Sequence, residues 1–159
     1  MKTKDEKTNV MRILDQKKIK YKSYNYLETG AISGMEVAEA LDENPNLTFK
    51  TLVTVGKTNN HYVFLAPVNK ELDLKKAAQA VNEKSIEMVK SKELLSLTGY
   101  IHGGCSPIGM KKSFKTVIDN SAKNYDKLIF SGGKIGYQVE TTLDELKKVI
   151  DFDLKDITK

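Results

Sequence analysis

The sequence predicts an α+β domain built on a mixed β-sheet. Helical and strand patterns alternate from end to end, and several strands are joined by hairpin-length connections. Such connections argue against a doubly wound parallel sheet, whose strands need long crossovers. The chain has 159 residues, 40% of them hydrophobic, and shows no internal repeat, so we expect one domain over residues 1–159.

The first third predicts two helices with a strand between them. Val10 and Leu14 share one face at helical spacing. Residues 21–26 are aromatic and polar in the manner of a strand. Ser33 and Glu36 have the spacing of a capping box, in which each side chain bonds the other residue's free N–H, so a helix begins there.

The middle third predicts a hairpin followed by two short helices. Residues 51–55 and 62–68 are apolar, β-branched or aromatic, and the polar residues 57–60 separate them. Asp73 can cap the helix that follows. A second helix begins at Ser91 or Lys92, and Gly99 ends it.

The last third predicts short strands punctuated by glycines. Residues 100–101 are expected as a strand leading into Gly103 and Gly104. Residues 116–118, 127–130 and 137–140 are further strands, with a glycine-rich loop at 131–136. Thr142 and Glu145 form a second capping pair, for a helix through residues 143–150.

Composition excludes several classes of protein. The single cysteine, Cys105, excludes an intramolecular disulfide and a cysteine-cluster zinc site, and only two histidines are present. No apolar run has the length of a membrane span, and the basic N-terminal segment is not followed by an apolar stretch. We therefore expect a soluble cytoplasmic protein with no metal and no cofactor.

The charge balance permits a nucleic-acid partner without requiring one. The chain carries 26 Lys+Arg against 21 Asp+Glu, a net charge of +5. Arg12 is the single arginine, although surfaces that bind phosphates in a forked geometry usually use more. A lysine-rich solvated surface is the competing interpretation.

Two motifs resemble catalytic ones and are interpreted otherwise. His102 and Cys105 could form a base and a nucleophile, but no cysteine-hydrolase motif surrounds them, so Cys105 is favoured as a small buried residue and His102 as an ordinary strand or loop residue. Residues 104–111 approach a phosphate-binding P-loop, yet Met110 stands where that motif needs lysine.

Two diglycine loops carry a further possibility. Gly103–Gly104 and Gly132–Gly133 each follow a predicted strand and can expose consecutive backbone N–H groups to an anion or a developing oxyanion. Tight turns are the favoured interpretation from the local sequence. Lys50, at the start of an apolar strand, is unremarkable by itself.

Taken in order along the chain, several segments resemble the YbaK family of aminoacyl-tRNA deacylases, and most closely its Cys-tRNA(Pro)/Cys-tRNA(Cys) deacylase branch. The resemblance covers nearly the whole chain. It implies a central mixed, mainly antiparallel sheet or partial barrel flanked by helices. The matching segments are residues 49–52, 72–78, 84–89, 98–100, 103–104, 106–109 and 131–140.

The resemblance also implies roles for individual residues. Three are implied as catalytic: Lys50, Gly103 and Gly104. Six are implied to bind substrate: Tyr26, Ser33, Thr51, Ser131, Gly132 and Gln138. The chain departs from the compared pattern at two places, because Ile32 or Ser33 stands where an aromatic residue is expected and Gln138 replaces an acidic residue.

The implied reaction is trans-editing, in which the cysteine of Cys-tRNA(Pro) or Cys-tRNA(Cys) attacks its own ester and leaves the tRNA. The implied partners are the acceptor end of the tRNA and prolyl-tRNA synthetase in a transient ternary complex. Two alternatives stay open: a family relative that clears alanine or another small amino acid, and a non-catalytic module that binds tRNA or a synthetase.

Overall fold

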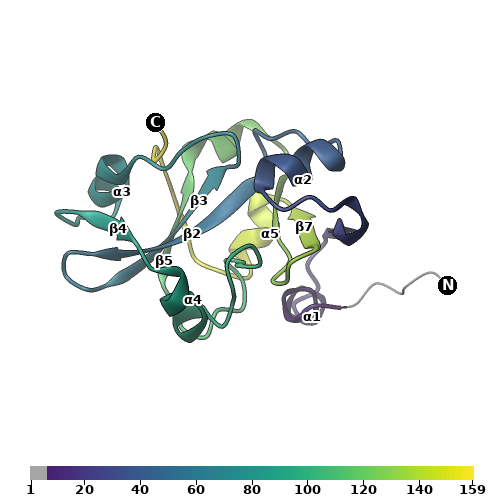
Figure 1. The fold of residues 1–159 in the computed structure, drawn as a ribbon, viewed down its shortest axis with the longest axis horizontal. Helices are drawn as coiled ribbons and strands as arrows, with labels where there is room; N and C mark the ends of the chain where they lie inside the picture. The colour runs from purple at the N-terminus through teal and green to yellow at the C-terminus, as the bar shows by residue number, and fades with distance from the viewer. Residues whose placement is uncertain (1–6) are drawn as a thin grey trace.

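The structure is a computed structural model that describes residues 7–159, so the first six residues of the basic N-terminal segment lie outside it. Helices and strands are interspersed along the chain (Figure 1). The α-helices are α1 (Asn9–Gln16), α2 (Gly34–Ala40), α3 (Leu74–Ala80), α4 (Ser91–Thr98) and α5 (Leu143–Lys147), with 3-10 turns η1 (Leu27–Thr29) and η2 (Asn120–Asn124). The strands are β1 (Lys22–Asn25), β2 (Phe49–Gly56), β3 (His61–Pro67), β4 (Ile86–Met88), β5 (Lys115–Asp119), β6 (Leu128–Ser131), β7 (Tyr137–Thr141) and β8 (Asp153–Lys155). Within the described residues, none of the helices combines the length and apolar character that crossing a bilayer requires.

The strands form two sheets that meet beside β2. One has the order β4-β2-β3-β5-β8 and the other β1-β7-β6. β5 runs parallel to β3 and to β8, whereas the other strand pairs are antiparallel. Thr48, just before β2, forms a parallel bridge with Ile129 of β6 and joins the two sheets. The predicted α+β class with a mixed, mainly antiparallel sheet is confirmed.

Local signals place most helix starts and the hairpin correctly. β2 and β3 pair antiparallel as predicted. Ser33 and Glu36 form both bonds of the capping box before α2. At α5 the Thr142 hydroxyl accepts the N–H of Glu145, while the Glu145 carboxylate pairs with Lys148 at 3.2 Å.

Residues 100–101 do not form the predicted strand. α4 ends at Gly99, and the chain then turns so that the N–H of Tyr100 donates to the Thr98 hydroxyl at 3.0 Å. The Tyr100 hydroxyl donates to the Ile108 carbonyl. Side chains thus satisfy a segment that has no neighbouring strand among the described residues, and Gly103 follows a loop, not a strand.

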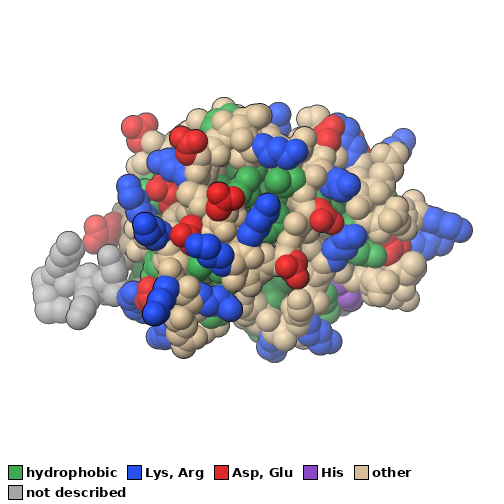
Figure 2. Space-filling model, turned by 180° about the vertical axis from the view of Figure 1, so that it is seen from behind, with side chains coloured by type: hydrophobic (Ala, Val, Ile, Leu, Met, Phe, Trp, Pro, Cys, Tyr) green, Lys and Arg blue, Asp and Glu red, His purple; other side chains and the backbone are tan. Residues whose placement is uncertain are grey.

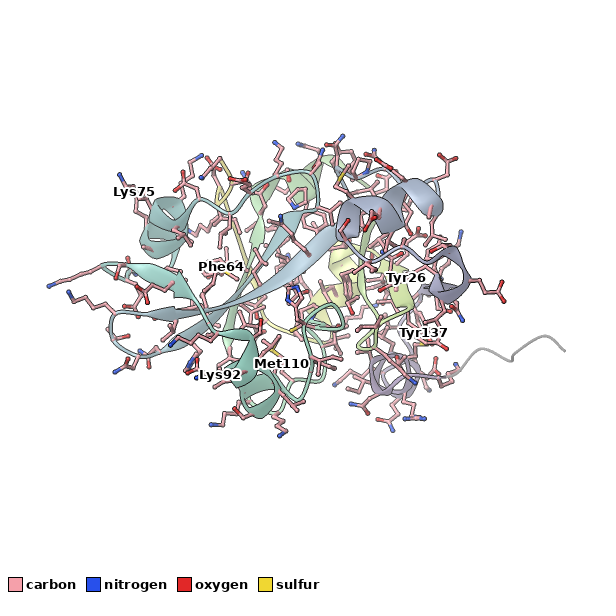
Figure 3. All side chains as sticks on the ribbon, in the orientation of Figure 1. Tyr26, Phe64, Lys75, Lys92, Met110 and Tyr137 are labelled. Carbon is pink, nitrogen blue, oxygen red and sulfur yellow. The ribbon has the colours of Figure 1, made fainter. Side chains whose placement is uncertain are left out.

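Two hydrophobic clusters form the core, and β3 contributes side chains to both, Phe64 to one and Leu65 to the other. β3 is central and almost wholly buried, with Phe64 fully enclosed (Figure 3). Val10 and Leu14 of α1 are fully buried in the same core cluster as Phe130 and Tyr137. Burying side chains of this size contributes about 1.5–3 kcal/mol each, so packing supplies most of the stability of so short a helix.

Gly133 fixes the approach of the 131–136 loop to α1, and replacing it should be costly. Its φ is +90°, and a Cβ there would lie 2.6 Å from Val10 Cγ2. Gly133→Ala should lower the unfolding free energy by about 2–4 kcal/mol, through backbone strain plus overpacking. Gly30→Ala is the matched control, because Gly30 has φ +72° with open space around it. Urea denaturation should show a loss of only about 1 kcal/mol there, and equal losses would contradict the packing argument.

Candidate active site

A gap in sheet pairing along β2 opens a cavity. One edge of β2 pairs with β3 throughout. Along the other edge, Thr48 bridges β6 and pairing with β4 starts only at Thr54. Val53 directs its carbonyl to this edge, where it accepts the N–H of Val89, so Thr51, two residues earlier, directs its backbone groups the same way. The cavity beside this stretch has a volume of about 440 Å³.

The cavity gathers most of the residues predicted for the site. Its lining includes seven of them: Tyr26, Ser33, Lys50, Thr51, Gly103, Ser131 and Gln138. Gly104 and Gly132 are buried neighbours of lining residues. Tyr26 and Tyr137 both lie on the side of the cavity formed by the three-stranded sheet (Figure 3). Segments from both sheets and both diglycine loops therefore converge on one place.

Lys50 brings a positive charge to the cavity wall. Its side chain is half-buried, and burial lowers the pKa of the ammonium, with Glu71 acting in the opposite direction. Within residues 7–159 no carboxylate lies within ion-pair distance of it. The charge is consequently available to an anionic or electron-rich group in the cavity.

Thr51 adds a hydroxyl that has no partner among residues 7–159. Its Oγ1 is buried and makes no hydrogen bond within the described part of the chain, and the residue lines the cavity. Buried polar atoms in native proteins are almost always paired. A bound polar ligand is a natural partner for this atom.

The first diglycine loop offers one free backbone donor. The N–H of Gly104 donates to the Ile101 carbonyl at 3.0 Å and closes a turn. Gly104 also packs closely on neighbouring backbone, since an added Cβ would lie 3.1 Å from the Ile135 nitrogen. For the N–H of Gly103, at the cavity, the described residues supply no acceptor. Gly103 is therefore the donor of this pair that a ligand can use.

The second diglycine loop is a turn that shapes the cavity. The N–H of Gly132 donates to the Tyr137 carbonyl at 2.8 Å, and the N–H of Gly133 donates to the Ser131 hydroxyl at 3.1 Å. Both donors are used within the loop. Its contribution to a site is then the Ser131 side chain, which lines the cavity.

The segment before α2 forms the mouth of the cavity. Ile32 lines it with 83% of its surface exposed. The Ser33 hydroxyl accepts the N–H of Glu36 at 3.1 Å as the helix cap. Ser33 can therefore contact a ligand only while it also holds the start of α2.

His102 and Cys105 both line the cavity, a convergence that the sequence did not indicate. Cys105 is only 8% exposed, and burial raises the pKa of its thiol to about 12. Because the thiolate is the nucleophilic form, Cys105 is poorly suited to attack a substrate. The predicted buried cysteine is confirmed.

Comparison with known proteins identifies the family of this chain. The sequence profile of the aminoacyl-tRNA editing domain matches residues 31–149. The chain belongs to this family. The predicted resemblance to the YbaK proteins is thereby confirmed.

One relative matches this editing-domain protein over nearly its whole length. It is a protein of Enterococcus faecalis that carries the name Cys-tRNA(Pro)/Cys-tRNA(Cys) deacylase EbsC as a provisional assignment. The two chains are 43% identical over 154 residues, which is 96% of this chain and 94% of the relative.

Two solved structures share the fold of this editing domain. One is provisionally described as a trans-editing enzyme for prolyl-tRNA synthetase, with TM-score 0.81, 23% identity and coverage of 96% of this chain and 98% of that chain. The other is a hypothetical protein with TM-score 0.85, 19% identity and coverage of 94% and 99%.

A second hollow lies away from the editing-domain cavity. It has a volume of about 950 Å³ between residues 107–116 and 147–153 and contains none of the predicted site residues. Its lining holds three lysines and two aspartates, and Lys115 lies 4.0 Å from Asp153. The hollow therefore carries only a small excess of positive charge. The described residues also hold no group of three or more His, Cys, Asp or Glu that could bind a metal ion.

Proposed function

We propose that this protein is a cytoplasmic trans-editing deacylase that releases cysteine from mischarged Cys-tRNA(Pro) and from Cys-tRNA(Cys). One observation carries the proposal: the ammonium of Lys50, which has no ion-pair partner among residues 7–159, shares a cavity with the Gly103 N–H and the Thr51 hydroxyl, next to a cysteine that is too buried to act. A cavity of about 440 Å³ accommodates an aminoacyl group with part of the terminal nucleoside.

In the proposed reaction the substrate supplies its own nucleophile. The cysteine thiol loses its proton to solvent, and the thiolate attacks the ester carbonyl of the same residue. The C–S bond forms, the bond to the ribose oxygen breaks, and that oxygen takes up a proton as it leaves. The products are a cyclic thioester, which water later opens to cysteine, and free tRNA. Folding the aminoacyl group for this attack converts binding into several kcal/mol of rate enhancement.

The protein groups that line the cavity then have electrostatic and positioning roles. Lys50 stabilises the thiolate and the charge on the reacting ester, and the Gly103 N–H donates to the developing oxyanion. Thr51 bonds the bound substrate through its free hydroxyl. Gly104 holds the loop that presents Gly103. The remaining residues proposed to shape the substrate pocket are Tyr26, Ser33, Ser131, Gly132 and Gln138.

The acceptor end of the tRNA is the proposed ligand, with selectivity supplied by prolyl-tRNA synthetase in a transient ternary complex. On the face seen in Figure 2, lysines are interspersed with acidic side chains and do not gather in one broad patch. Such a surface favours limited contact with the acceptor end over tight independent binding of a whole tRNA.

The decisive experiment follows the loss of ester from Cys-tRNA(Pro), Ala-tRNA(Pro) and Pro-tRNA(Pro), with and without the synthetase. We expect cysteine to be released and proline to be retained. Release of alanine at the rate of cysteine would favour the relative that uses water as the nucleophile. Salt-sensitive binding with no accelerated ester loss would indicate a non-catalytic module.

Cys105→Ser should keep deacylation within about threefold of the unmodified protein, because a thiol with a pKa of about 12 supplies no nucleophile. Its unfolding free energy should fall by about 1–2 kcal/mol, since a hydroxyl replaces a buried thiol. Initial rates with Cys-tRNA(Pro) and urea titrations measure the two effects. An inactive but normally folded variant would instead restore the protein cysteine as nucleophile.

A further inference from the structure

Gln138 is a neutral polar side chain in the wall of the proposed substrate pocket. It lies in β7, between Tyr24 of β1 and Ser131 of β6, and is only 7% exposed. A side-chain amide has a donor end and an acceptor end. Which end faces the cavity decides what kind of group it can bind.

Glu43 determines the orientation of that amide. The Gln138 nitrogen donates to Glu43 Oε2 at 2.6 Å and to Oε1 at 3.2 Å, whereas the reverse orientation would bring its carbonyl oxygen against the carboxylate. Gln138 lines the cavity and Glu43 does not. With the nitrogen turned to Glu43, the carbonyl oxygen is the polar atom left for a ligand.

The backbone holds Glu43 in place for this contact. Asp42 adopts a left-handed conformation with φ 54°, and its N–H donates to the Glu39 carbonyl at 3.2 Å. The N–H of Glu43 reaches back to the Ala38 carbonyl at 2.8 Å. These two bonds form a Schellman motif at the end of α2, which fixes where the Glu43 side chain begins.

We propose that Glu43 is a positioning residue that, through the Gln138 amide, makes the pocket select substrates with a protonated α-amino group. The proposal rests on the proposed function, which supplies an aminoacyl ester as ligand. The carboxylate polarises the amide, so its carbonyl oxygen becomes a stronger acceptor for an ammonium. The negative charge of Glu43 thus acts indirectly, because Glu43 lies behind Gln138 and does not itself line the cavity.

The charged and titratable groups around Glu43 make this selection sensitive to pH. They are Glu140 of β7, Tyr24 of β1 and Lys127 before β6. Burial, with Glu140 adding to it, raises the pKa of Glu43 to about 7, against the opposing effects of the hydrogen bonds to Gln138 and Thr48 and of the charge on Lys127. Once protonated, Glu43 can donate to the Gln138 carbonyl, and the amide is free to turn. Selection for the ammonium should therefore weaken as the pH falls through 7.

The test measures binding of an amide-linked, non-cleavable probe, 3′-cysteinylamino-3′-deoxyadenosine, and of its N-acetyl form. At pH 7.5 we expect about tenfold preference for the free amine. Glu43→Gln should abolish the preference, because a neutral amide pairs with Gln138 in either orientation. Glu39→Gln, which removes the same charge from the exposed face of α2, should retain it. Preference retained in Glu43→Gln would overturn the proposal.

Two further readouts exclude a merely structural effect. At pH 6 the preference of the unmodified protein should shrink, although simple protonation of the ligand amine would enlarge it; enlargement would overturn the proposal. The double variant Glu43→Gln/Gln138→Glu moves the carboxylate into the pocket wall and should restore the preference for the free amine. A folded double variant without that preference would overturn the proposal. The probe binds without being cleaved, so absence of deacylation refutes the proposed function and leaves this test intact.

Discussion

Lys50→Ala is expected to lower the rate of Cys-tRNA(Pro) deacylation by at least about 10²–10³-fold. The reason is electrostatic, since the variant removes the positive charge that is proposed to stabilise the thiolate and the reacting ester. Because burial already lowers the pKa of this ammonium, the fold gains little from it. The unfolding free energy should change by less than about 1 kcal/mol. Single-turnover rates and urea titrations on the same preparation measure both.

Two variants make this result specific. Lys57→Ala removes an exposed lysine from the turn that joins β2 to β3, and it should leave the rate unchanged. Lys50→Arg keeps the charge but replaces a compact ammonium with a planar fork, so we expect partial activity. If folded Lys50→Ala retained more than about a tenth of the activity, the role proposed for Lys50 would be wrong.

Features set by local chemistry could be predicted from the sequence. The capping box at Ser33 and Glu36 needs only two side chains three residues apart, and the structure contains both of its bonds. Asp73 likewise accepts the N–H groups of Lys75 and Lys76. The β2–β3 hairpin joins neighbouring strands through a short turn, so it too is local information.

Features set by distant partners could not be predicted in the same way. β4 and β8 have three residues each, too few for a clear period of two, and they form by adding to β2 and β5. Residues 100–101 have strand-like side chains, yet no strand in the described part of the chain lies beside them. Pairing decides these assignments, and pairing depends on the whole topology.

The candidate site shows the same division. The resemblance pointed to Lys50 and Gln138, and both line the cavity. It did not point to Glu43, an acidic residue in a polar turn with no local signal, which contacts Gln138 across 95 positions of sequence. The cavity itself arises because β6 and β4 leave the same edge of β2 at different points, and no run of residues encodes that gap.

Replacing the substrate's thiol by a hydroxyl is expected to lower the rate even though the substrate still fits. Serine and cysteine differ by one atom, and a cavity of about 440 Å³ discriminates little between them by size. A free thiol has a pKa near 8.5 and is a few per cent ionised at pH 7, whereas a hydroxyl is a far weaker nucleophile. Ser-tRNA(Pro) should therefore lose its ester at least about 10³-fold more slowly than Cys-tRNA(Pro), and Ala-tRNA(Pro) more slowly still.

The pH dependence separates this mechanism from attack by water. Below the pKa of the substrate thiol, the cysteine rate should rise about tenfold per pH unit, because only the thiolate attacks. Because Lys50 is proposed to stabilise that thiolate, the profile should level off at a lower pH than it does for free cysteine ethyl ester, and Lys50→Ala should move it back. Rates measured from pH 5.5 to 9 on Cys-tRNA(Pro) and Ala-tRNA(Pro) give both comparisons. Equal rates and parallel profiles for the two esters would mean that the sulfur takes no part in bond breaking.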